Sequence, residues 1–139
     1  MAKTVADVMT SDPITVAASD SVAEVAGRMR SGGTGAVLVM DDGQLVGIVT
    51  DRDIVVRVVA ADKPSSTPVR EACSSGGLVT VSADTSIDNV VELMRDNAIR
   101  RVPVVENGSP VGIVSIGDLA LERDPDSALA DISAAHPNT

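Results

Sequence analysis

The hydrophobic positions of this chain follow the same pattern twice, at a constant offset of 65 residues, so that Val25 corresponds to Val90 and Met29 to Met94. Residues 15–54 and 80–119 align without a gap. Self-similarity at a fixed period indicates a repeat architecture. Two copies are too few for a solenoid, so we expect one compact body with pseudo-two-fold symmetry, in which equivalent surfaces form paired clefts.

Each copy predicts a β-α-β-β-α unit, and the fold class is therefore α+β. Apolar residues at i, i+3, i+4 and i+7 predict a buried helical stripe. Two short apolar runs joined by a turn that contains Gly43 or Gly108 predict a hairpin, and a further helix should begin at Thr50 and at Ser115. The expected ranges are helical turns at 5–9 and 69–73, extended segments at 14–16 and 79–81, helices over 22–29 and 87–94, strands at 36–40, 45–49, 102–105 and 111–114, and a weak C-terminal helix over 127–134.

The helix from Ile54 to Ala60 is apolar around most of its circumference, with Arg57 as the only interruption. A helix of this kind is buried on more than one side. We expect it to pack against its own sheet and also against the second repeat or another subunit. We expect a homodimer, because this helix and the apolar stripe of the helix over 22–29 offer more apolar surface than one small sheet can cover.

Composition narrows the function classes. A formal net charge of −9 disfavours nucleic acid as a partner. No apolar run approaches the ~20 residues that cross a bilayer, and the first residues lack the apolar core of a secretory signal, so a cytoplasmic location is expected. The single cysteine, Cys73, excludes an internal disulfide and fits a small core position equivalent to Met9. The chain has no Phe, Tyr or Trp, so a planar ligand would have to lie between aliphatic side chains and backbone.

Catalysis is not expected. The only histidine, His136, lies in a C-terminal tail that we expect to fray, so no Ser/His/Asp or Cys/His set can form on an ordered scaffold. Neither a phosphate-binding Gly-rich loop nor a Cys/His metal-ligand set is present. Asp41-Asp42 is interpreted as a turn pair rather than a cation site.

A hydroxyl residue and an aspartate stand three positions apart where a strand runs into a helix in both copies, as Thr50 and Asp53 and as Ser115 and Asp118. One interpretation is a capping box, in which the two side chains satisfy free backbone N–H groups. The other is a ligand site, because a helix N-terminus attracts phosphate and the carboxylate can accept two ribose hydroxyls. The two interpretations are compatible.

With these motifs the chain resembles a tandem pair of CBS domains, the Bateman module, over residues 5 to 122. The strings that carry the resemblance are Val8-Met9-Thr10, Asp12-Pro13, Thr15-Val16, Thr50-Asp51-Arg52-Asp53-Ile54, Arg100-Arg101-Val102-Pro103-Val104-Val105 and the Gly-hydrophobic-x-[Thr/Ser]-x-x-Asp motif in both copies. The predicted division is repeat 1 over 1–60, a linker over 61–68, repeat 2 over 69–122 and a tail over 123–139.

The resemblance implies a regulatory module, without a cofactor of its own, that binds AMP, ADP, ATP or S-adenosylmethionine in two clefts between the repeats. By position it implies ribose contacts at Asp53 and Asp118, phosphate contacts at Thr50 and Ser115, adenine contacts at the backbone of Thr15, Val16, Thr80 and Val81, and aliphatic walls at Val37, Val102 and Pro103. The alternative function is a protein-interaction or stress-response module that needs no ligand, with a target protein that the sequence does not identify.

The two clefts are not expected to be equal. The second repeat has Arg100 and Arg101 where the first has Gly35 and Ala36. Arginines before this strand are plausible phosphate ligands; the alternative is a solvated pair near Asp96 or Glu106.

Overall fold

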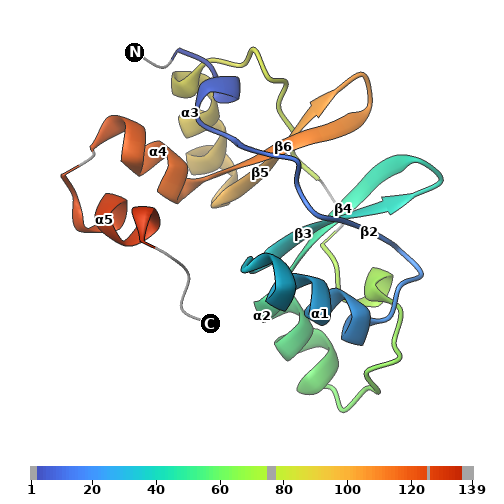
Figure 1. Ribbon diagram of the computed structural model, residues 1–139. Helices are drawn as coiled ribbons and strands as arrows, with labels where there is room; N and C mark the ends of the chain where they lie inside the picture. Colours follow the sequence, from blue (N-terminus) through green and yellow to red (C-terminus); the bar gives the residue numbers. More distant parts are fainter. Residues whose placement is uncertain (1–2, 75–77, 125, 136–139) are drawn as a thin grey trace. The chain divides into compact units, whose positions relative to one another are not determined.

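A computed structural model describes residues 3–74, 78–124 and 126–135 (Figure 1). It has the expected α+β composition, with helices and strands alternating along both repeats. The chain divides into two packing units: residues 14–78 form one, and residues 3–13 together with residues 79–135 form the other, where described. No helix of the described residues is long and apolar enough to span a membrane.

The unit of residues 14–78 is built on a three-stranded sheet in the order β2-β3-β4. Strand β2 runs parallel to β3, and β3 pairs antiparallel with β4 with Val37 opposite Val49. The elements in chain order are β2 (Thr15–Ala17), α1 (Val22–Gly32), β3 (Ala36–Asp41), β4 (Gln44–Thr50), α2 (Asp51–Ile54), the π-helix η2 (Val55–Val59) and the 3-10 helix η3 (Val69–Glu71).

The second unit repeats this arrangement with a sheet in the order β1-β6-β5. Val102 lies opposite Val114 in the β5–β6 hairpin, the same register as in β3–β4, and both hairpins carry an irregularity after their fourth pair. Its elements are the 3-10 helix η1 (Val5–Asp7), β1 (Thr10–Ser11), α3 (Ile87–Asn97), β5 (Arg101–Glu106), β6 (Ser109–Ser115), α4 (Ile116–Arg123) and α5 (Ala128–Ala134). The expected extended segment at 79–81 forms only a bridge, between Val81 and Val104.

The opening turn of each repeat packs with the hairpin of the other repeat. Strand β1 pairs antiparallel with β6, and Ser74 forms an antiparallel bridge to Ile48 of β4. Val5 is completely buried in the core of α3, β5 and β6, whereas Val69 is completely buried in the core of α1, β3 and β4. The sequence repeats and the packing units therefore divide the chain differently. The predicted ends of the first repeat, the linker and the second repeat, at residues 60, 68 and 122, stay predictions.

The predicted helical stripes form the two cores. Val22, Val25 and Met29 of α1 are buried, and Ile87, Val90 and Met94 of α3 occupy the equivalent places. Ser21 and Ser86 cap the two helices. The first helix ends at Gly33 in the left-handed region, and the second ends in the same conformation at Ala98, with φ 53°.

The helix after Thr50 buries one face within its own unit. Only Val58 of η2 is buried, while the side chains of Val55, Val56 and Val59 are 56%, 45% and 66% exposed. The expected cover on a second side, by the second repeat or by another subunit, stays a prediction.

Candidate functional site

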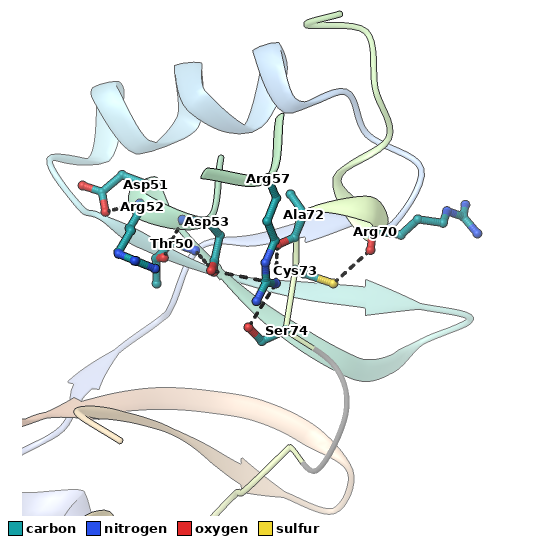
Figure 2. Close-up of polar contacts among 9 residues, drawn as sticks. All are labelled: Thr50, Asp51, Arg52, Asp53, Arg57, Arg70, Ala72, Cys73 and Ser74. Atoms are coloured by element: carbon teal, nitrogen blue, oxygen red, sulfur yellow. Dashed lines mark hydrogen bonds and ion pairs between the residues drawn. The ribbon is translucent and has the colours of Figure 1, made fainter. Parts of the chain in front are cut away.

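The junction of β4 and α2 forms the predicted capping box (Figure 2). The backbone N–H of Thr50 donates to Asp53 Oδ2 over 2.9 Å, and the backbone N–H of Asp53 donates to Thr50 Oγ1 over 3.1 Å. These bonds satisfy N–H groups that a helix start leaves free. The capping interpretation is confirmed here, and both side chains are only partly buried.

The junction of β6 and α4 repeats this geometry. The Ser115 N–H donates to Asp118 Oδ2 over 2.8 Å, and the Asp118 N–H donates to Ser115 Oγ over 3.2 Å. The carboxylate in each repeat is therefore held in position by a backbone N–H through Oδ2, and its second oxygen, Oδ1, takes no part in the capping box.

The strands place the remaining predicted residues beside these junctions or in the cores. Thr15 of β2 lies opposite Leu38, and the Val81 N–H donates to the carbonyl of Pro103. Thr80 is exposed, whereas Val16, Val81 and Pro103 are buried. The expected aliphatic walls, Val37 and Val102, have no exposed surface and belong to the two cores.

The two aspartates differ in the residue that follows four positions later, one helical turn along the chain. Arg57 Nη1 lies 3.9 Å from Asp53 Oδ1 and donates to the carbonyl of Ala72 over 2.9 Å and to Ser74 Oγ over 3.3 Å (Figure 2). The equivalent of Arg57 in the second repeat is Glu122. The first carboxylate thus has a cation beside it, and the second has an acid at the corresponding position.

Cys73 lies within this arginine network and packs against the core around Val69, as its predicted role as a small hydrophobe requires. Its thiol donates to the carbonyl of Arg70. Burial raises the pKa of the Cys73 thiol, and the negative charge of Asp53 adds to the rise. In the sequence Arg57 stands out only as an interruption of an apolar helix, but its i+4 spacing from Asp53 is the signal that identifies its role.

A pocket of about 340 Å³ opens at the start of α4. Its lining comes from the start of β5, from the β6–α4 junction and from α5, namely Arg100, Arg101, Ser115, Ile116, Gly117, Leu129 and Ser133. Arg101 lies opposite Ser115 in the hairpin, and the Arg100 carbonyl accepts from the Ile116 N–H, so the two arginines are fixed beside the helix N-terminus.

The two predicted roles of these arginines, as phosphate ligands or as a solvated pair, both stay predictions. Asp96 lies 3.8 Å from Arg95, and Glu106 accepts a hydrogen bond from the Ala83 N–H. Neither acid is paired with Arg100 or Arg101 in the described part of the chain. Both arginine residues are exposed and line the pocket.

Residues 3–74, 78–124 and 126–135 contain no group of three His, Cys, Asp or Glu side chains that could hold a metal ion. His136, and with it the predicted fraying of residues 136–139, lies outside the described residues.

The CBS domain family model matches residues 5–60 and again residues 69–123. The chain belongs to the CBS domain family. It is 43% identical over 133 residues to the uncharacterized protein YlbB of Bacillus subtilis, a match that covers 91% of this chain and 89% of that protein. The chain is accordingly a CBS-domain pair, a regulatory type of module.

Two solved structures support the same assignment. The CBS-domain containing protein ATU1752 of Agrobacterium tumefaciens is 36% identical, with a TM-score of 0.76 over 88% of this chain and 95% of that chain. The CBS domain pair of protein MJ0100 is 27% identical, with a TM-score of 0.78 over 89% of this chain and 98% of that chain, and was solved in complex with 5′-methylthioadenosine and S-adenosyl-L-methionine.

Proposed function

We propose that this CBS-domain pair is a non-catalytic cytoplasmic sensor of adenosine phosphates. The observation that carries the proposal is the pocket at the start of α4, where Arg100 and Arg101 stand beside Ser115 and a helix N-terminus. Guanidinium groups bind phosphate oxygens, and the dipole of a helix N-terminus attracts them. The adenosine ligands of MJ0100 support the nucleoside part of the proposal.

Among the adenosine ligands that the family resemblance implies, the pocket favours AMP, ADP and ATP over S-adenosylmethionine. Two arginines face the ligand's polar end, and a sulfonium cation would be repelled there. Asp118 does not line the pocket itself but follows Gly117, which does. Its oxygen Oδ1, which the capping box does not use, is the proposed acceptor for ribose hydroxyls.

The second repeat should bind more tightly than the first. Gly35 and Ala36 replace the two arginines in the first repeat, and Arg57 already lies beside Asp53. Asp118→Ala should therefore lower nucleotide affinity more than Asp53→Ala does. Removing the carboxylate that pairs with the ligand should weaken binding about tenfold to a hundredfold, which corresponds to ~1–3 kcal/mol for a lost buried hydrogen-bond partner. Titration calorimetry on both variants measures this ranking.

The absence of aromatic residues makes a direct test possible. With no Trp or Tyr, the protein hardly absorbs near 260 nm, so a co-purified adenine would dominate that region of the spectrum. Ligand at a hundred times its Kd should add about 2.7 kcal/mol to the free energy of unfolding. If the protein carries no adenine and millimolar AMP, ADP, ATP and S-adenosylmethionine all leave the melting temperature unchanged, the sensor proposal is wrong. The ligand-independent interaction or stress-response module would then be preferred.

A further inference from the structure

The C-terminal helix α5 is docked against α4 (Figure 1). Ala130 is fully buried in this contact although its neighbours Leu129 and Ile132 are 42% and 72% exposed. Ser127 caps the helix through a hydrogen bond from the Ala130 N–H. A short helix on the surface would fray on its own, so the buried face of α5 is what keeps it in place.

Gly117 makes this docking possible. It is buried in the first turn of α4, and a Cβ built on it would lie 3.0 Å from Ser133 Cβ and closer still to Ser133 Oγ. Glycine inside a helix costs about 1 kcal/mol relative to alanine, and close approach of another element is a common reason for tolerating it. The first repeat has Arg52 at this position, fully compatible with its open, exposed helix start.

The docked helix lines the arginine pocket without filling it. Leu129 and Ser133 share the space of about 340 Å³ with Arg100, Arg101 and Ser115. A serine hydroxyl can donate to a phosphate oxygen, and Leu129 also lines the neighbouring apolar pocket between α3 and α4. Helix α5 is therefore placed as a wall of the pocket opposite the start of β5.

We infer that α5 is part of the ligand site of the second repeat, with Ser133 a specificity-determining residue for the phosphate end of the ligand. This inference rests on the proposed sensing of adenosine phosphates. It extends the site beyond the two CBS repeats, because Leu129 and Ser133 follow the second family match, which ends at residue 123.

The test displaces α5 from both sides of its contact in the full-length chain. Gly117→Gln puts a helix-compatible side chain where Ser133 packs, and Ala130→Glu puts a charge on the buried face of α5. The matched control is Gly27→Gln, because a Cβ on this α1 glycine meets nothing within 4 Å. Amide hydrogen exchange over residues 128–134 reports the docking, and titration with ADP and ATP reports the affinity.

Both displacing variants should exchange faster in α5 and bind ADP and ATP about tenfold more weakly, while Gly27→Gln matches the unmodified chain. Ser133→Ala should keep α5 docked and still weaken binding several-fold. Faster exchange with unchanged or tighter binding would overturn the inference, as would unchanged affinity of Ser133→Ala. If the unmodified chain binds the nucleotides and all variants bind equally, only this inference fails. If the unmodified chain binds none, the proposed function fails with it.

Discussion

At the scale of single residues, the two repeats share a capping box and differ in its surroundings. Thr50 with Asp53 and Ser115 with Asp118 make the same pair of hydrogen bonds, which is the part that the spacing of the motif predicts. Arg57 adds a cation to one box only. The motif therefore fixes the position of the carboxylate, and the residue four positions later adjusts its charge environment.

Arg57→Ala should destabilise the unit of residues 14–78. The Ala72 residue is fully buried, and its carbonyl accepts from Arg57 over 2.9 Å, so the substitution leaves a buried acceptor without this donor, at a cost of ~1–3 kcal/mol. Chemical denaturation measures the loss. Arg52→Ala is the matched control, because the exposed Arg52 side chain makes no ion pair or hydrogen bond with the described residues. Equal stability of the two variants would contradict this role of Arg57.

The Cys73 thiol should react slowly in the folded protein. Its pKa is raised, first by burial and then by Asp53, so at a given pH less of the reactive thiolate is present than in the unfolded chain. Alkylation at pH 8 should be several-fold slower in buffer than in denaturant, and the folded rate should keep rising as pH approaches the raised pKa. As the only cysteine, it gives a signal free of background; equal rates in both conditions would refute the prediction.

At the scale of elements, each hairpin depends on one glycine that faces a segment from the other sequence repeat. A Cβ on Gly47 of β4 would lie 2.9 Å from the Ser74 carbonyl oxygen, and a Cβ on Gly112 of β6 would lie 2.9 Å from that of Thr10. Cys73 packs at the first contact and Met9 at the second, which confirms that these two residues are equivalent.

Gly47→Ala and Gly112→Ala should each lower the free energy of unfolding by about 1–3 kcal/mol, because the added methyl group collides with backbone that cannot rotate away. Gly27→Ala in α1 should instead be neutral or stabilising by up to about 1 kcal/mol, since its Cβ has open space. Thermal denaturation of the three variants compares them. If only Gly27→Ala lost stability, this explanation of Gly47 and Gly112 would be wrong.

The elements that the sequence predicts well are those with a local signal. The stripe from Val22 to Met29 and the capping pairs define α1, α2 and α4 because the periodicity and the spacing lie within a few residues. The pairing of β1 with β6 has no such signal, because it joins residues about a hundred positions apart. The role of α5 in the pocket was missed for the same reason, since its docking depends on Gly117 rather than on its own weak pattern.

At the scale of the whole molecule, the single chain leaves apolar side chains exposed on both units. Val55, Val56 and Val59 form an apolar face on η2, and Ile116 and Ile132 are 46% and 72% exposed on α4 and α5. Large apolar patches are uncommon on monomeric proteins and mark interaction sites. The expectation from sequence that the helix after Ile54 is buried on a second side stays a prediction, and the cover that we propose is a second copy of the chain.

We therefore predict a homodimer in which η2 is covered by a second copy of the chain. Light scattering at micromolar concentration should give twice the mass of one chain, and the double substitution Val55→Asp with Val59→Asp should reduce it to one, because two buried carboxylates without partners oppose association. Gln44→Asp, on the exposed hairpin at the start of β4, is the control and should remain dimeric. A monomeric mass for the unmodified chain would count against the dimer. Retention of the dimer by the double variant would place the interface elsewhere, and the exposed side chains of α4 and α5 would then be the next surface to substitute.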